Sequence, residues 1–176
     1  MKNKTFISLL PLETERLIIR KTSLEDIDLL LKMDKQEATQ KYLGGMKNKT
    51  REERIAFLEK KISKFDKGLA GQLTICLKDG TPIGFIGLSI DEEKEFGKIG
   101  YLLDSDYWNQ GYCTEACKKL LEIGFDILHL KSITADTVEG NNSSKRVLEK
   151  LGFDYQNNFT KEDTIFCLYR KDNKLE

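Results

Sequence analysis

The stretch YWNQGYCTEA, residues 107–116, joins a strand-like segment to a long helical pattern. Residues 96–103 before it have the character of a strand, and apolar residues recur at helical spacing over residues 112–128. The first turn of a helix has unpaired N–H groups and about half a positive charge, so phosphates bind there readily. Gly111 has no Cβ and lets the backbone come close to a ligand. A single glycine before a helix more often marks a simple turn, so this stretch alone is a weak sign of a phosphate site.

The rest of the chain alternates strand and helix signals, which is typical of an α/β domain. Asp79-Gly80 separates two strand-like runs and predicts a tight hairpin. Ser23 and Thr50 are expected to cap two helices. We expect strands at residues 16–20, 73–77, 83–90, 96–103, 132–138, 153–155 and 164–170, helices after Ser23, after Thr50, at 112–128 and at 142–150, and loops at 40–50 and 156–163.

Length and composition are those of an ordinary globular chain. The 176 residues favour a single domain over residues 1–176, since domains typically have about 100–200 residues. Lys plus Arg and Asp plus Glu both number 29, so the formal net charge is zero and general nucleic-acid binding is disfavoured. The apolar run at residues 6–10 is too short for a signal-peptide core or a membrane span. We therefore expect a cytoplasmic protein with neither a nucleic-acid nor a membrane partner.

The four cysteines predict reduced thiols rather than a metal site. None of Cys76, Cys113, Cys117 and Cys167 belongs to a C-x-x-C pair. Cys113 and Cys117 are four residues apart on the expected helix, but no matching pair of ligands lies nearby and His129 is the only histidine. We expect four mostly buried thiols and no metal.

A second stretch of the sequence strengthens the interpretation of residues 107–116. EGNNSSKRVLEKLGF, residues 139–153, follows the next expected strand. Together with GYLL (100–103) and YWNQGYCTEA (107–116), it resembles the GNAT superfamily of acyl-CoA-dependent N-acetyltransferases, most closely the branch of ribosomal-protein N-terminal alanine acetyltransferases. The opening LETERL (12–17) is also similar to the usual start of that branch. The resemblance covers residues 12–170, nearly the whole chain.

The resemblance implies an α/β fold of the GNAT type, with a mixed, mainly antiparallel sheet of about seven strands flanked by about four helices. The sheet would splay between the strands at residues 96–103 and 132–138, and acetyl-CoA, the co-substrate, would lie in the splay. The implied reaction moves an acetyl group to a primary amine by direct attack in a ternary complex. A covalent route through Cys113 or Cys117 is the alternative, but it lacks a His/Asn partner.

The resemblance also implies, residue by residue, how acetyl-CoA is held. Backbone groups of Leu102 and Leu103 would pair with the pantetheine arm, as an added strand does at an open sheet edge. Asn141 would hydrogen-bond the pantetheine, and Ser144 would lie near the thioester sulfur. The phosphates would be held by the N–H groups of Gln110, Gly111, Tyr112, Cys113 and Thr114, and by Lys145 or Arg146.

The catalytic groups are less well defined, because two positions depart from the superfamily. Leu148 stands where much of the superfamily has a general-acid tyrosine, so Ser144 is the candidate acid, with helix capping or packing as its alternative role. Lys98 stands where many members have a glutamate base, and Glu95 is the nearest carboxylate upstream and the candidate base. Further candidates are Glu139, Glu162 and Asp163, although each of these carboxylates also fits a solvated surface charge.

The acceptor is expected to be a protein N-terminus or a small amine. An α-amino group, with a reference pKa of about 7.7–8.0, needs less help from a base than a lysine at about 10.4. The alternative hypothesis is a catalytically weak acyl-CoA-binding sensor or interaction module. Leu148 and Lys98 suggest it, because they stand where many superfamily members have catalytic residues. The sequence does not decide between a monomer and a homodimer.

Overall fold

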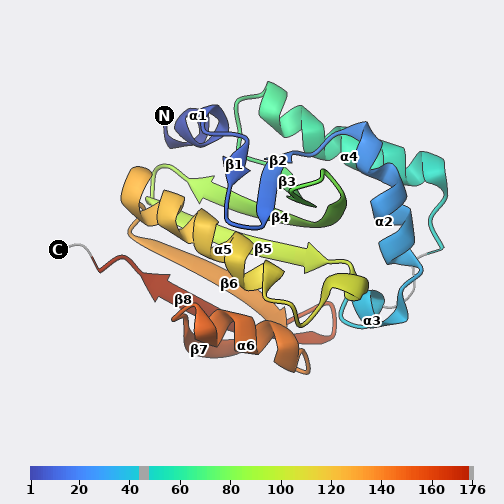
Figure 1. The fold of residues 1–176 in the computed structure, drawn as a ribbon. Helices are drawn as coiled ribbons and strands as arrows, with labels where there is room; N and C mark the ends of the chain where they lie inside the picture. The colour runs from blue at the N-terminus through green and yellow to red at the C-terminus, as the bar shows by residue number, and fades with distance from the viewer. Residues whose placement is uncertain (44–47, 175–176) are drawn as a thin grey trace.

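The computed structural model describes residues 1–43 and 48–174, which are arranged around one eight-stranded sheet (Figure 1). The strand order is β1-β2-β3-β4-β5-β6-β8-β7, and all neighbours are antiparallel except β5 and β6. The strands are β1 (Leu12–Glu13), β2 (Leu17–Lys21), β3 (Gln72–Leu77), β4 (Pro82–Asp91), β5 (Phe96–Leu103), β6 (Ser132–Val138), β7 (Asp154–Lys161) and β8 (Thr164–Asp172). The α-helices of the described residues are α1 (Lys2–Ser8), α2 (Ile27–Asp34), α3 (Glu37–Gln40), α4 (Arg51–Asp66), α5 (Tyr112–Glu122) and α6 (Asn142–Lys150). The expected mixed, mainly antiparallel sheet is confirmed, and the two-residue edge strand β1 brings it to eight strands.

Local sequence signals account for most of these boundaries. The Thr50 hydroxyl accepts a hydrogen bond from the Glu53 N–H at 3.1 Å and begins α4. Gly80 has a φ of 92°, and the Thr81 N–H donates to the Asp79 carboxylate at 2.9 Å in the expected β3–β4 hairpin. The strands β5 and β6 and the helix α6 begin and end at the expected residues. The expected loop at residues 40–50 is described only in part, because residues 44–47 lie outside the described residues.

Helices cover both faces of the sheet. In Figure 1, α5 crosses in front of the sheet, and its buried residues join the main core with β2 to β6. On the opposite face, α2 and α4 enclose a second core with Phe85 of β4 and Leu102 of β5. None of the helices in the described part of the chain is long and apolar enough to cross a membrane. The two cores place β4 and β5 at the centre of the molecule, between α5 and the α2–α4 pair.

The parallel strands β5 and β6 pair only over a short distance. The register joins Phe96 to Ser132, Gly97 to Ile133 and Lys98 to Thr134, and no pair follows within the described strands. β6 continues beside β8 as far as Val138, while β5 continues beside β4 as far as Leu103. The two strands therefore separate after Lys98, as the expected splay requires.

The helix expected at residues 112–128 changes type partway. α5 ends at Glu122, and residues 123–127 form a π-helical turn in which the Leu128 N–H donates to the Ile123 carbonyl at 2.9 Å. Gly124 explains why this turn fits, since a Cβ there would lie 2.6 Å from the Ile133 side chain of β6. The wider turn thus lets the backbone pack directly on the sheet.

The sequence patterns predicted neither α1 nor α3, and the strand that they predicted at residues 153–155 is shorter than β7. α1 is formed by residues that were considered only as a short apolar run. The loop expected at residues 156–163 is instead most of β7 and its turn into β8, and Glu162 and Asp163 both adopt positive φ values, as a two-residue I′ turn requires. A Glu-Asp pair is not a usual signal for this turn, and β7 is exposed on both faces, so it lacks the alternating pattern of a half-buried strand.

A buried ion pair fixes the start of α2 against the sheet. The Asp26 side chain is 1% exposed and accepts hydrogen bonds from Arg20 Nη2 at 2.7 Å and from the Thr74 hydroxyl at 2.7 Å. It also accepts from the Ser23 N–H at 2.9 Å, as expected where Ser23 begins the helical segment. One carboxylate therefore joins β2, β3 and the turn that leads into α2.

Asp26→Ala should lower the free energy of unfolding by about 3 kcal/mol, because it removes the buried carboxylate that accepts hydrogen bonds from Arg20, Thr74 and the Ser23 N–H. Asp28→Ala, which breaks the exposed pair with Arg51, is the matched control and should cost less than about 1 kcal/mol. Urea unfolding followed by circular dichroism measures both values. Equal losses for the two variants would contradict the structural role of Asp26.

Candidate active site

The separation of β5 from β6 leaves one edge of β5 without a strand partner. The Asp104 N–H donates to the Ile83 carbonyl of β4 at 2.9 Å, so the backbone groups of Leu102, two residues earlier, also face β4. The backbone groups of Tyr101 and Leu103 consequently face the gap. Of the two residues expected to pair with a ligand there, Leu103 presents its backbone to the gap, while Leu102 pairs with β4 and Tyr101 takes its place.

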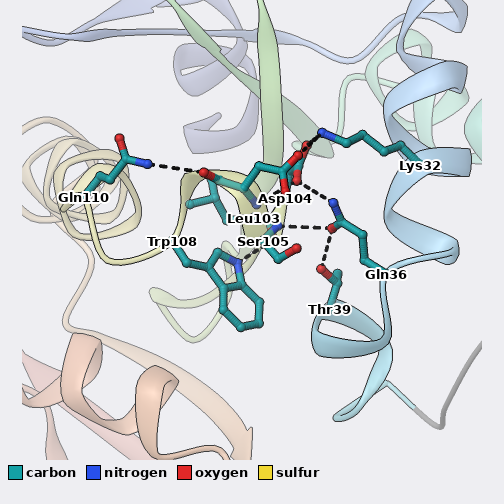
Figure 2. A network of polar contacts seen from close by, with 9 residues as sticks. Lys32, Gln36, Thr39, Leu103, Asp104, Ser105, Trp108 and Gln110 are labelled. Atoms are coloured by element: carbon teal, nitrogen blue, oxygen red, sulfur yellow. Dashed lines mark hydrogen bonds and ion pairs between the residues drawn. The ribbon is translucent and has the colours of Figure 1, made fainter.

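A cavity of about 240 Å³, called the gap cavity below, lies between the diverging strands. Trp108 lines it, and its indole Nε1 donates to the Leu103 carbonyl at 2.8 Å (Figure 2). Of the residues expected at the site, the gap cavity is lined by Leu102, Leu103, Cys113, Asn141 and Ser144. The remaining expected residues, Gln110, Gly111, Tyr112 and Thr114, do not line it but form the turn that begins α5 around Cys113. The structure therefore gathers both motif stretches around one cavity.

The turn before α5 is shaped by two left-handed residues. Asn109 has a φ of 59°, and Gly111, the residue that caps α5, has a φ of 83°. Arg16 Nη1 donates to the Gln110 carbonyl at 2.9 Å and holds the turn from the β1–β2 side. A Cβ on Gly111 would lie 3.2 Å from Arg16 Nη2, a flexible side-chain end, so the positive φ is what favours glycine at this position. The first N–H groups of α5, which have no partner within the helix, begin directly after this turn.

Glu115 would be an unfavourable neighbour for an anion, but its charge is compensated. Its carboxylate accepts hydrogen bonds from the Thr14 hydroxyl at 2.6 Å and from the Arg16 N–H and Nε at 2.9 and 2.7 Å. Burial alone would raise the pKa of Glu115, but the bonds from Thr14 and Arg16 outweigh it and keep the pKa below its ordinary value. Arg16 also lies over the Tyr112 ring, 4.5 Å from its centroid. No individual role was expected of Thr14 or Arg16, although both belong to the LETERL stretch.

Two hydroxyl groups meet at the wall of the gap cavity. The Tyr101 and Ser144 hydroxyls are 2.9 Å apart, and the Asn141 carboxamide oxygen accepts from the Ser144 N–H at 3.1 Å, capping α6. Burial raises the pKa of Tyr101, so its phenol stays protonated at neutral pH. Leu148, at the position of the superfamily's tyrosine, is fully buried in the main core. Tyr101 therefore places a second hydroxyl beside Ser144, and no sequence motif predicted a catalytic role for it.

The carboxylates expected as bases lie elsewhere. Glu95 precedes β5 at the end away from the gap and forms ion pairs with Lys131 at 2.9 Å and Lys2 at 3.3 Å, which lower its pKa. Glu139 accepts a hydrogen bond from Asn158 at 2.9 Å. Glu162 and Asp163 form the β7–β8 turn. None of these four carboxylates lines the gap cavity or the second cavity described below.

A different carboxylate lies where the strands separate. Asp136 of β6 lines the gap cavity, its side chain is 19% exposed, and it forms an ion pair with Lys98 of β5. An acidic residue within the mostly buried run SITADTV was the available sequence signal, since buried carboxylates are rare unless they are paired. This ion pair with Asp136 gives Lys98 a structural role at a position where many superfamily members have a glutamate.

A second cavity, of about 470 Å³ and called the α4 cavity below, lies on the other face of the sheet. α2 and α4 cover it, and Phe85, Gly87 and Ser89 of β4 form part of its floor. It shares Leu43 and residues 99–102 with the gap cavity. The two cavities therefore meet along β5, where a molecule in one would approach a molecule in the other.

Asp104, at the end of β5, ties this strand to the helices that cover the α4 cavity. Its side chain is 2% exposed and accepts hydrogen bonds from Lys32 Nζ and Gln36 Nε2, both at 2.7 Å (Figure 2). The Ser105 N–H donates to Gln36 Oε1 at 3.1 Å, and so does the Thr39 hydroxyl at 2.7 Å. Burial alone would raise the pKa of Asp104, but the bonds from Gln36 and Lys32 outweigh it and lower the pKa. The turn that leads to α5 is thus anchored on α2 and α3.

The cysteines are all free thiols. Cys117 is fully buried beside Cys113, and burial raises the pKa of its thiol well above the ordinary value. Within residues 1–43 and 48–174, no group of three or more His, Cys, Asp or Glu side chains is placed to hold a metal ion.

Known proteins share this fold and this sequence pattern. The family model for the acetyltransferase (GNAT) domain matches residues 16–154. The uncharacterized N-acetyltransferase p20 of Bacillus licheniformis is 32% identical over 148 residues, covering 81% of each chain. The putative ribosomal N-acetyltransferase YdaF of Bacillus subtilis is 33% identical over 78 residues, covering 44% of this chain and 43% of its own. The crystal structure of a GNAT-family acetyltransferase from Bacillus anthracis superposes with a TM-score of 0.78 at 25% identity, over 91% of this chain and 96% of the other.

GNAT acetyltransferases use acetyl-CoA as a co-substrate together with an acceptor. The family match spans both motif stretches, the α4 cavity and every residue that lines the gap cavity except Phe166. The chain belongs to the GNAT acetyltransferase family and is an acyltransferase.

Proposed function

We propose that this enzyme transfers the acetyl group of acetyl-CoA to a primary amine by direct attack in a ternary complex. The observation that carries the proposal is the meeting of the gap cavity and the α4 cavity along residues 99–102. A thioester in the first cavity and an amine in the second would approach each other there. Direct transfer then needs no acetyl-enzyme, which agrees with the inert environment of the fully buried Cys117.

The residues of the gap fit acetyl-CoA. The backbone groups of Tyr101 and the N–H of Leu103 are available to the pantetheine arm, while the Leu103 carbonyl accepts a hydrogen bond from Trp108, and the Asn141 side chain lines the same cavity. The N–H groups from Gln110 to Thr114 lie at the start of an 11-residue helix, which favours the diphosphate there. Arg16 holds this turn through the Gln110 carbonyl and neutralises Glu115, so no unpaired negative charge from Glu115 opposes the diphosphate. Lys145 or Arg146 on α6 would meet the terminal phosphate.

Ser144 and Tyr101 are the proposed proton donors to the departing thiolate. Their hydroxyls are 2.9 Å apart, so Ser144 can donate toward the cavity while the Tyr101 phenol donates to Ser144. This pair supplies the hydroxyl that Leu148 lacks.

The amine must lose a proton before it attacks, and two routes are open to it. In the first, the α-amino group arrives largely neutral and water carries its proton away. In the second, Asp136 accepts the proton, because its carboxylate lies at the divergence of β5 and β6, held by Lys98. Glu95 would have to act from the opposite end of β5, so we favour Asp136 over Glu95. The partial similarity to a putative ribosomal N-acetyltransferase supports a protein N-terminus as the acceptor, with a small amine as the alternative.

Gly111→Ala should raise the Kd for acetyl-CoA about tenfold, because the added Cβ is strained at positive φ and displaces the turn that presents the N–H groups. Gly80→Ala is the matched control: its φ of 92° imposes a similar strain, but a Cβ there meets nothing within 4 Å and the hairpin is remote from the gap. Isothermal titration calorimetry gives both Kd values. An unchanged Kd for Gly111→Ala would contradict the diphosphate site.

Ser144→Ala and Tyr101→Phe should each lower kcat by about 10²-fold, since each removes one member of the donor pair. The Kd for acetyl-CoA should stay within about twofold, because neither change touches the backbone groups that bind it. Tyr155→Phe, which removes an exposed hydroxyl bonded to Asn158, is the control and should leave kcat unchanged. Full activity in both site variants would exclude a role for these hydroxyls.

Asp136→Asn should lower kcat/KM by about 10²-fold at neutral pH if its carboxylate accepts the amine proton. Glu95→Gln should leave kcat/KM unchanged, because Glu95 only forms ion pairs outside the two cavities. Initial rates of thiol release across pH 6 to about 9 test both variants. Unchanged rates for both would favour the route in which the amine arrives already neutral, and a large loss for Glu95→Gln alone would refute our assignment.

A further inference from the structure

The inward face of α4 is unusually basic. Arg54, Phe57, Lys61 and Lys64 follow one another at spacings of three or four residues, so they lie on the same side of the helix, and all four line the α4 cavity. Lys98 reaches the same cavity from β5 on the opposite wall. Asp34 is the one carboxylate among the described residues that line it.

Two of these cations already have partners. Arg54 Nε donates to Asp34 Oδ2 at 2.5 Å, and the Asp34 side chain is 4% exposed. Lys98 is paired with Asp136. The lone carboxylate of the cavity is therefore neutralised and offers no free negative charge to an acceptor.

Lys61 and Lys64 differ from these pairs. In the part of the chain that the structure describes, neither has a carboxylate within ion-pair distance. The ammonium of Lys61 is half-buried and lies 5.1 Å from the centroid of the Phe57 ring. Burial, and then repulsion from Lys64 and Lys60, lowers the pKa of Lys61. An anion bound between Lys61 and Lys64 would relieve both effects.

The two lysines are set apart from the point of transfer. The gap cavity joins the α4 cavity along residues 99–102 of β5, whereas the turn of α4 that carries Lys61 packs over the start of β3. There, a Cβ on Gly71 would lie 3.3 Å from the Lys61 carbonyl oxygen. An acceptor with its amine at β5 would thus extend over β4 and place a second group near Lys61 and Lys64.

We infer that the acceptor is an acidic amine, a molecule that carries an anionic group at some distance from its primary amine, and that Lys61 and Lys64 bind this group. The inference rests on the proposed transferase function and names the acceptor class. A peptide N-terminus followed by Asp or Glu residues has the required chemistry. Polyamines do not, because they would bring more positive charge to a cavity whose carboxylate is already paired.

The test compares acceptors that differ only in charge. Thiol release from acetyl-CoA is measured with tripeptides Ser-Glu-Glu, Ser-Gln-Gln and Ser-Lys-Lys, and with spermidine. The wild-type kcat/KM should be about tenfold higher for Ser-Glu-Glu than for Ser-Gln-Gln, lower again for the cationic acceptors, and the preference should shrink with added salt. A comparison of O-phosphoethanolamine with ethanolamine shows whether phosphate serves as well as carboxylate.

Matched double variants show whether Lys61 and Lys64 cause the preference for acidic acceptors. Lys61→Gln with Lys64→Gln should abolish the preference through a higher KM for Ser-Glu-Glu, with the Kd for acetyl-CoA within about twofold of wild type. Lys60→Gln with Lys67→Gln removes the same charge from exposed positions and should keep the preference. Lys61→Glu with Lys64→Glu should favour Ser-Lys-Lys.

Three outcomes would overturn the inference. Turnover of all peptides at equal kcat/KM, or a preference that survives in the Lys61/Lys64 variants, would remove the anion site and leave the transferase intact. Acetyl-CoA binding without turnover of any amine would overturn the proposed function as well.

Discussion

The site depends on the loss of pairing between β5 and β6 after Lys98. A sheet interior normally uses all its backbone groups within the sheet, and an unpaired edge tends to attract another extended chain. Here the unpaired edge lies in the middle of the sheet, with β4 on one side and the β6–β8 pair beyond the gap. The groups of Tyr101 and Leu103 therefore face a cavity instead of a neighbouring strand. An extended ligand with amide groups can complete this edge, while the same opening gives the thioester access to the other face of the sheet.

Polar contacts from distant parts of the chain keep this opening in shape. Asp104 bonds Lys32 and Gln36, so the end of β5 and the turn after it are held by α2 and the segment before α3 (Figure 2). On the other side of the same turn, Arg16 bonds both Gln110 and Glu115. The start of α5 is thus fixed from two directions by residues that touch neither proposed substrate. Because a buried carboxylate such as Asp104 is costly to leave unpaired, α2 and α3 cannot move away from β5 without breaking these bonds. Hydrogen bonds at this turn therefore connect the helices that cover the α4 cavity to the start of α5 beside the gap cavity.

The sequence was sufficient for the scaffold and for the coenzyme side of the site, but not for the acceptor side. Helix and strand periods predicted β5, β6 and α6 to the residue, and the two motif stretches do surround one cavity. These patterns did not predict the direction of individual backbone groups. Leu102 and Leu103 both line the gap cavity, but only the backbone N–H and carbonyl of Leu103 face it, because those of Leu102 pair with β4. Glu95 was the candidate base because it is the nearest carboxylate before Lys98 along the chain. A strand rises about 3.3 Å per residue, so three residues along β5 separate Glu95 from Lys98 by about 10 Å. Asp136 is distant in sequence, and only the pairing of β5 with β6 brings it to Lys98. Side-chain partners across a sheet require the register, which the sequence did not supply.

The charge pattern of the α4 cavity also bears on how the amine loses its proton. A formal net charge of zero conceals local imbalance, since the acidic residues that offset the cavity lysines lie elsewhere on the chain. Lys98 stands near the junction of the two cavities, where much of the family has a glutamate. Because Lys98 is paired with Asp136, this position adds no net negative charge, whereas a glutamate there would favour the ammonium form of a bound amine. The replacement of a carboxylate by a lysine then has a chemical advantage: it lets an α-amino group, already the least basic of the common protein amines, bind in its neutral, reactive form. The same cations that would draw an acidic acceptor into the cavity would thus reduce its need for a strong general base.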